Sequence, residues 1–254
     1  MMNRQTIISA KHLKKSFGKG ESIQVVYSDL NVDIYKGDFT VIMGSSGAGK
    51  STLMYSLSGM DKPDSGEIHF DGVDITKLNN DKLAVFRRRQ CGFVFQQIYL
   101  IDKMNLMDNV ITAGILTCKD REDIRNRAKE LFSLVNIPEK TWRKTSSRIS
   151  GGEAQRAGIV RAVINSPNVL FADEPTGALN SANSTAVLDV FTSLHNREQS
   201  IVMVTHDKKS ALRGNRIIYI KDGKISGECD LGKFEPGNIE RTERLDKFMK
   251  EMGW

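Results

Sequence analysis

One eight-residue segment combines glycines, a lysine and a serine at the spacing that binds phosphate. Residues 44–51 read GSSGAGKS and match the pattern G-x-x-x-x-G-K-[ST]. Glycines let backbone N–H groups turn inward around phosphate oxygens, and a helix that begins after Gly49 points its positive end at them. The context fits, because the apolar run Phe39–Met43 precedes the loop and a helical pattern follows it. We therefore predict a nucleotide-phosphate site, with Lys50 at the β- and γ-phosphates and the Ser51 hydroxyl on Mg²⁺. The residues assigned to the nucleotide here are Gly44, Ser45, Ser46, Gly47, Ala48, Gly49, Lys50, Ser51 and Thr52.

Two acids follow a second apolar run. Val169–Ala172 reads as a buried strand, and Asp173 and Glu174 come directly after it. A carboxylate at such a strand end can hold Mg²⁺, usually through water, and the next one can orient or deprotonate an attacking water. Alone, the pair is equally typical of a solvated strand end. The phosphate loop in the same chain favours a site in which Asp173 binds the metal and Glu174 acts on water.

The order of short apolar runs and helical patterns predicts an α/β fold. Strands are expected at residues 6–10, 23–34, 39–43, 67–70, 92–95, 168–172, 200–205 and 216–220. Helices are expected from Lys50, over 81–90, from Arg148 and over 182–195. Between them, residues 108–137 change to helical periodicity, with apolar side chains such as Ile124 and Phe132 on one face. This order implies a mostly parallel sheet flanked by helices, with a helical insertion in the middle.

Composition excludes several classes of protein. Hydrophobic residues are 39% and charged residues 27% of the 254, which is ordinary for a globular domain. No apolar run approaches the roughly 20 residues of a membrane-spanning helix, and the start has no signal-peptide pattern. The three cysteines are far apart and indicate reduced thiols. The net charge of +6 is spread along the chain, which favours a solvated basic surface over a nucleic-acid or lipid site. We expect a cytosolic location.

A third motif points to a family. Residues 149–156 read ISGGEAQR, about 100 residues after the phosphate loop, and resemble the signature LSGGQxQR of ABC ATPases. Over about residues 6–227 the chain resembles the ATP-binding subunits of ABC transporters. The resemblance implies that Gln96 is the Q-loop glutamine, that His206 is the switch histidine steadying the γ-phosphate, and that Phe17 stacks on adenine.

The resemblance also implies a fold and a mechanism. The fold is an α/β P-loop NTPase (RecA-like) core with an antiparallel β subdomain and a helical subdomain at about 97–150, all within residues 1–227, followed by a charged C-terminal extension at 228–254. ATP would join two copies into a homodimer, and hydrolysis would release them. The residues expected to close over the γ-phosphate bound by the other copy are Ser150, Gly151 and Gly152. The metal ligands implied are Ser51, Gln96 and Asp173.

Finer features resemble one subfamily. Phe93–Gln96, Ala172–Leu179 and the long segment between Phe17 and Tyr27 resemble the ATPases of lipoprotein release, macrolide export and antimicrobial-peptide resistance. The resemblance implies an integral-membrane permease partner of the FtsX-like or MacB-like type, with few transmembrane helices and a large extracytoplasmic domain. It places the chain at the cytoplasmic face of the membrane, with the helical insertion touching the permease.

Two residues depart from the family pattern, and two other functions stay open. Glu153 replaces the first glutamine of the signature, and Asn180 replaces the usual aspartate of the D-loop. A nucleic-acid-linked ABC ATPase would carry long coiled coils before the signature, and sustained heptads are missing there, so no nucleic-acid partner is expected. A poorly hydrolysing regulatory module is favoured by Asn180 but disfavoured by Glu174 and His206.

Overall fold

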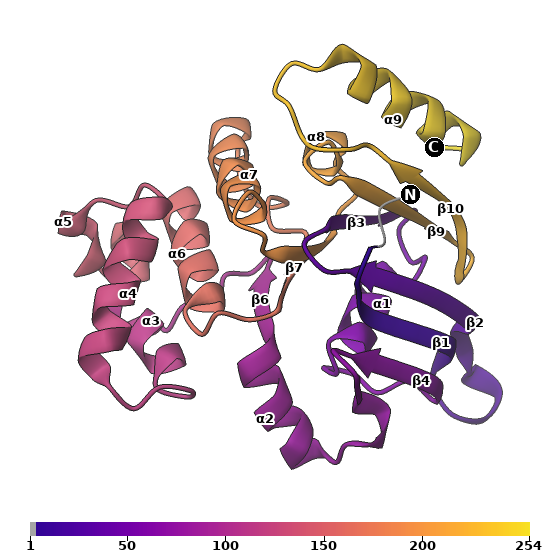
Figure 1. Cartoon of the computed structure of the whole chain (residues 1–254), viewed down its shortest axis with the longest axis horizontal. Helices are drawn as coiled ribbons and strands as arrows, with labels where there is room; N and C mark the ends of the chain where they lie inside the picture. The colour runs from indigo at the N-terminus through magenta and orange to yellow at the C-terminus, as the bar shows by residue number, and fades with distance from the viewer. Residues whose placement is uncertain (1–3) are drawn as a thin grey trace. The chain divides into compact units, whose positions relative to one another are not determined.

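The computed structural model of the chain describes residues 4–254 (Figure 1). The chain divides into two compact units. The first contains the described residues up to Ala84 together with Glu198–Trp254, and the second is Val85–Arg197. Helix α2 (Asn80–Gln90) runs across the junction.

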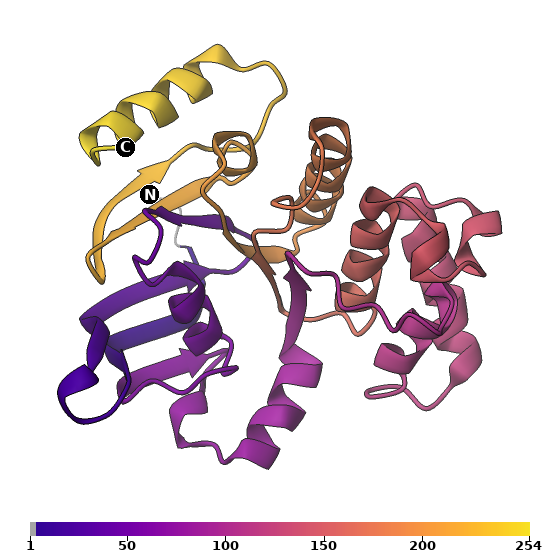
Figure 2. The same cartoon turned by 180° about the vertical axis from the view of Figure 1, so that it is seen from behind.

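The first unit contains an antiparallel sheet with the strand order β2-β1-β4-β5. Its long strands lie side by side in Figure 2. Buried and exposed side chains alternate along much of β1, which therefore has one covered face and one solvated face. The strands and the short 3-10 turns beside them are β1 (Thr6–Phe17), η1 (Gly20–Ser22), β2 (Gln24–Tyr35), β4 (Ser65–Phe70), β5 (Val73–Asp74) and η2 (Ile75–Lys77).

The same unit contains four more strands in the order β10-β9-β3-β8. Every residue of β3 (Phe39–Gly44) is buried, and β3 pairs in parallel with both β8 (Ser200–Val204) and β9 (Arg216–Lys221). Strand β10 (Lys224–Asp230) runs antiparallel to β9. The helices are α1 (Lys50–Leu57), the short α8 (Lys208–Ala211) and α9 (Ile239–Glu251). An all-buried strand with parallel neighbours reads as one continuous apolar run, which is why the sequence indicated β3 and β8.

The C-terminal segment is part of this unit. The boundary predicted at residue 227 falls inside β10, and α9 lies along β9 and β10 (Figure 1). Helix α9 buries Leu245, Phe248 and Met249, and the ring of Phe248 meets that of Tyr219 edge-on at 6.5 Å. The sequence analysis expected a charged extension after the ATPase domain and did not predict this packing. The few apolar residues of α9 stand at helical spacing, but charged residues surround them in the sequence.

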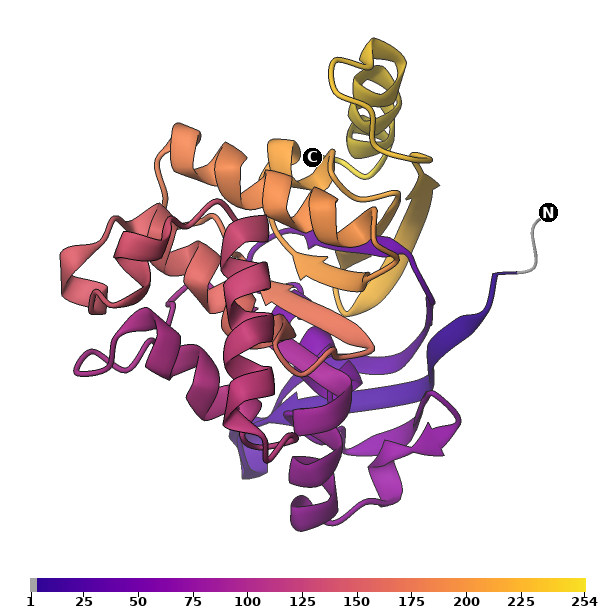
Figure 3. The same ribbon diagram turned by 60° about the vertical axis from the view of Figure 1, so that its left-hand side comes forward.

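The second unit pairs two parallel strands and carries the inserted helices (Figure 3). The segment predicted as helical over 108–137 contains two helices, α3 and α4. The break comes after Gly114, and Asp120 caps the second helix by accepting hydrogen bonds from the backbone N–H groups of Glu122 and Asp123. The elements are β6 (Cys91–Phe95), α3 (Leu106–Gly114), α4 (Arg121–Leu134), α5 (Glu139–Trp142), η3 (Ser146–Arg148), α6 (Gly151–Val163), β7 (Val169–Asp173) and α7 (Ser181–His195). The predicted α/β class, with mostly parallel strands, an antiparallel sheet and inserted helices, is confirmed.

Candidate functional site

The phosphate loop follows β3 directly and depends on close backbone approaches. Gly44 has φ +151°, and a Cβ there would lie 2.1 Å from the carbonyl oxygen of Ile220 on β9. Gly49 has φ +93°, and a Cβ there would lie 2.6 Å from Cγ1 of Val26. Neither position accommodates a side chain in this conformation. Strand β9 thus constrains the first end of the turn that leads into α1, and strand β2 constrains the second.

The start of α1 is prepared for an anion. The Lys50 ammonium donates to the carbonyl oxygens of Gly44 at 2.9 Å and Ser45 at 2.8 Å, so the cation lies against the loop. Within the described part of the chain, no side chain caps α1 at Gly49, and its first turn holds no acid. Helix α4, by contrast, has an aspartate cap and two acids in its first turn. The first turn of α1 therefore carries no acidic side chain of its own, which suits a polyphosphate.

An aromatic platform ends β1. Phe17 is its last residue and is 49% exposed. The Lys15 ammonium lies 5.0 Å from the centroid of that ring, is itself buried, and is 2.7 Å from a carboxylate oxygen of Asp61. A ring held on one face by a fixed cation leaves its exposed area for a nucleobase to stack on. The sequence analysis missed Lys15, although residues two apart on a strand share a face.

The paired acids lie at the carboxyl end of β7. Asp173, the last residue of β7, is the pairing partner of Phe95, the last residue of β6. Gln96 and Glu174 are therefore the next residues after the ends of two neighbouring parallel strands. Glu174 has φ +45°, a left-handed conformation that is uncommon outside glycine. Its carbonyl accepts a hydrogen bond from the N–H of Gly177, where a Cβ would lie 3.0 Å from Nε2 of Gln96. The structure therefore brings Gln96 to the turn that presents Glu174.

Helix α6 holds the chain on both sides of the predicted Q-loop glutamine, Gln96. The Gln155 amide donates to the carbonyl oxygen of Phe95 at 3.0 Å. The Arg161 guanidinium donates to the carbonyl of Ile98 at 2.7 Å and to that of Tyr99. Burial lowers the pKa of Arg161 below its ordinary value, although an arginine stays charged. Neither Gln155 nor Arg161 was predicted, because contacts to distant carbonyls leave no sequence pattern.

The signature motif begins α6 with a capping box. Ser150 is the N-cap, and its Oγ accepts a hydrogen bond from the N–H of Glu153 at 3.2 Å. In return, the Glu153 carboxylate accepts from the backbone N–H of Ser150 at 2.9 Å. Gly152 faces α7 so closely that a Cβ would lie 2.4 Å from Oδ1 of Asn183. The S-x-x-E spacing of residues 150–153 indicates such a box, although it was not among the features predicted above.

The remaining predicted residues follow strand ends and helix caps. His206 follows β8 by two residues and is exposed. Asn180 caps α7 by accepting from the N–H of Asn183 at 3.0 Å, a role for which asparagine is among the preferred residues. The predicted site residues belong to both units. The first unit carries Phe17, Gly44–Thr52 and His206, and the second carries Gln96, Ser150–Gly152, Asp173 and Glu174.

The donor set predicted for a metal fits Mg²⁺. Ser51, Gln96 and Asp173 offer a hydroxyl, an amide and a carboxylate oxygen, and Mg²⁺ prefers oxygen ligands. Across residues 4–254, no group of three or more His, Cys, Asp and Glu side chains is arranged to hold a metal.

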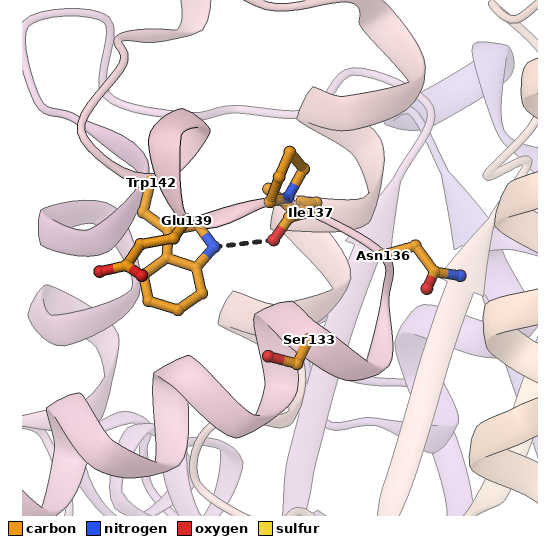
Figure 4. Close-up of a pocket in the computed structure, with 6 residues that line it drawn as sticks. Ser133, Asn136, Ile137, Glu139 and Trp142 are labelled. Carbon is orange, nitrogen blue, oxygen red and sulfur yellow. Dashed lines mark hydrogen bonds between the residues drawn. The ribbon is translucent and has the colours of Figure 1, made fainter.

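A hollow in the second unit is lined by none of the predicted site residues. It has a volume of about 440 Å³ and is formed around the end of α4 and the start of α5 (Figure 4). The Trp142 indole N–H donates to the carbonyl of Ile137 at 2.8 Å, and its ring stacks on Phe132 with centroids 5.5 Å apart. With Glu139 as the one charged residue in its lining, the hollow shows no catalytic constellation.

Comparison with known proteins decides the family. The sequence profile of ABC transporters matches residues 27–177, more than half of the chain. The chain belongs to the ABC transporter family. The resemblance seen in the signature and the phosphate loop is thereby confirmed.

Relatives and solved structures agree. The chain is 37% identical to the uncharacterized ABC transporter ATP-binding protein MJ1508 of Methanocaldococcus jannaschii, over 86% of this chain and 97% of that protein. It is 39% identical to the macrolide export ATP-binding/permease protein MacB of Aggregatibacter actinomycetemcomitans, over 86% of this chain. The chain spans about a third of that relative, 34%. Among solved structures, the dimeric ATP-binding cassette MJ0796 bound to ADP and Pi matches with a TM-score of 0.81 and 35% identity, over 89% of this chain and all of that one.

No helix among the described residues has the length and apolar character that crossing a bilayer requires.

Proposed function

We propose that this chain binds and hydrolyses ATP as the nucleotide-binding subunit of an ABC transporter and powers a membrane permease by ATP-driven dimerisation. The observation that carries the proposal is the loop at residues 44–51. Gly44 and Gly49 lie closely against neighbouring backbone and side-chain atoms, Lys50 lies against the loop, and α1 begins there with no acid in its first turn. This is a site for the phosphates of a nucleotide.

The proposed chemistry divides among a few side chains. Lys50 binds the β- and γ-phosphates, and Glu174 orients and deprotonates the attacking water. Gln96 and His206 contact the γ-phosphate region, and the half-exposed ring of Phe17 stacks on adenine. Bound through Ser51, Asp173 and Gln96, Mg²⁺ would neutralise charge that develops on the phosphoryl group.

A second copy of the chain completes the site in this proposal. Ser150, Gly151 and Gly152 stand at the start of α6, where a hydroxyl and backbone N–H groups suit the γ-phosphate held by the other copy. The relative MJ0796 is described as dimeric in a post-hydrolysis state, which supports a dimer that ATP forms and hydrolysis releases.

The partner proposed is an integral-membrane permease with few transmembrane helices, and the chain would act at the cytoplasmic face of the membrane. The support is the relative MacB, named for macrolide export and for joining ATP-binding and permease functions, of which this chain spans about a third. Export, lipoprotein release and resistance to antimicrobial peptides are the transport classes that the subfamily resemblance favours.

The test of hydrolysis is Glu174→Gln. The amide keeps the shape of the side chain but cannot take a proton from water, so we expect ATP binding to persist, turnover to fall at least about a hundredfold, and a stable dimer to form with Mg-ATP. Phosphate release and size-exclusion chromatography measure these effects. Glu198→Gln is a matched control, because Glu198 is also a left-handed glutamate but exposed. Near-normal turnover of Glu174→Gln would remove Glu174 from the mechanism.

Transport itself is tested with the permease. A candidate permease of the proposed type, reconstituted in lipid, should bind the chain and change its ATPase rate. Full hydrolysis without a response to any such permease would contradict the transport role, whereas poor hydrolysis would favour the regulatory module.

A further inference from the structure

We propose that Glu153 competes with the γ-phosphate for the donors of Ser150, and so limits how tightly ATP joins two copies of this chain. The inference deepens the proposed function and rests on it. It assigns a regulatory role to the residue at which this chain departs from the signature of its family.

One carboxylate oxygen occupies both donors of the signature serine. Oε2 of Glu153 lies 2.9 Å from the backbone nitrogen of Ser150 and 2.9 Å from its Oγ. Because Oγ accepts from the N–H of Glu153, the hydroxyl hydrogen is free to point at Oε2. A phosphate that takes the hydroxyl or the N–H of Ser150 must therefore displace Glu153 from that group.

The competitor carries charge. Hydrogen bonds from the backbone N–H and then the hydroxyl of Ser150 lower the pKa of Glu153 against its partial burial, and the positive charges of Arg156 and Lys144 act in the same direction. The carboxylate is therefore ionised at neutral pH. Ser150 and Gly151 are exposed, so the same helix end that a phosphate would approach already holds a negative group.

The two helix ends of the proposed site thus differ. Helix α1 has no acid in its first turn, whereas α6 has Glu153. A glutamine at position 153 would keep one oxygen acceptor for the capping box and remove the charge. The carboxylate consequently stabilises the start of α6 in the separate chain and opposes closure over ATP. The ATP-bound dimer of this chain therefore opens readily.

The experiment measures ATP-dependent dimerisation by sedimentation velocity in the Glu174→Gln background, which removes hydrolysis. Adding Glu153→Gln should lower the ATP concentration for half-maximal dimer by about threefold to tenfold, because the repulsion at a helix end is removed. The ratio between the two proteins should shrink when NaCl is raised from about 0.05 M to 0.5 M, since salt screens partly exposed charges. Glu122→Gln makes the same change in the first turn of α4 and should leave the dimer unchanged.

A double-mutant cycle ties the effect to the serine. In a Ser150→Ala background, the gain from Glu153→Gln should fall by at least about half, because the contested hydroxyl is gone. Melting curves of all variants confirm folding.

The outcomes separate the two proposals. If the Glu174→Gln protein fails to dimerise with ATP, the proposed function fails. If it dimerises but Glu153→Gln gives the same midpoint, or a weaker dimer with an unchanged melting curve, the role of Glu153 is overturned while the function stands. A gain of equal size at high salt, or in the Ser150→Ala background, also overturns it.

Discussion

Lys50 does two things in the phosphate loop. Its ammonium supplies the one cationic side chain of residues 44–51, and it donates to two carbonyl oxygens of the loop. Lys50→Ala should weaken ATP binding at least tenfold, which is about 1.4 kcal/mol or more, because a charge-assisted contact is lost. Isothermal calorimetry measures this, with the exposed Lys36→Ala as the control. Unchanged affinity in Lys50→Ala would mean that the loop does not bind the phosphates.

Phe17 is the residue that contacts the base in the proposed site. Phe17→Ala should weaken ATP binding by about tenfold, since stacking of a base on an aromatic ring contributes about 1–3 kcal/mol. Binding of inorganic tripolyphosphate, which has no base, should stay unchanged, and Phe17→Tyr should behave like the parent protein. The half-exposed ring makes a large change in melting temperature unexpected. Equal losses for ATP and tripolyphosphate would place Phe17 outside base recognition.

At the scale of elements, Asn180 links the turn after Glu174 to α7. Asn180→Asp keeps the oxygen that caps the helix, so the melting temperature should stay nearly constant. The added negative charge at the proposed dimer interface should change the ATPase rate or its cooperativity by about tenfold or less, roughly 1.4 kcal/mol. Steady-state kinetics across ATP concentrations measure this. Asn238→Asp, at the N-cap of α9, is the matched control, and a rate change of equal size there would argue for an indirect effect.

Elements with one simple pattern were predictable from the sequence. The all-buried strands β3 and β8 read as continuous apolar runs, and the face of α4 was correctly read from Ile124 and Phe132. Strand β1 was predicted too short, because lysines and a histidine follow Ala10 and its pairing shifts register there. A bulged strand breaks the strict alternation on which such a prediction depends.

The candidate site was predictable where a motif fixes the local backbone and not where a distant contact does. The phosphate loop, the acids after β7 and the cap at Asn180 follow from short patterns. The bond from Lys15 to Asp61 and the bonds from Arg161 to the carbonyls of Ile98 and Tyr99 join segments far apart in sequence. Such contacts depend on packing, which a single sequence does not reveal.

At the scale of the whole chain, Arg241 connects α9 to the rest of the first unit. The buried guanidinium donates to five backbone carbonyls, and desolvation lowers its pKa from the ordinary value while leaving it charged. Those carbonyls belong to Leu212, Gly214, Leu231, Gly232 and Lys233. Arginine is rarely buried, so the charged sequence of α9 gave no reason to predict that Arg241 would be buried.

Arg241→Leu should lower the free energy of unfolding by about 3 kcal/mol, because several buried carbonyls lose a charged donor. Urea denaturation followed by circular dichroism measures the change. Lys247→Leu, at an exposed position of the same helix, should shift stability by about 0.5 kcal/mol or less. If the two variants unfold alike, the carbonyl bonds of Arg241 contribute no net stability.

The approach of Gly44 to Ile220 constrains the evolution of the two positions unequally. The atom that a Cβ at residue 44 would strike is a carbonyl oxygen, 2.1 Å away, and every amino acid carries one. Selection therefore acts on residue 44 alone, which tolerates no replacement, while residue 220 can drift among the apolar side chains that suit a buried strand. A saturation library screened for growth would show one surviving residue at position 44 and several at its neighbour across the strand pair.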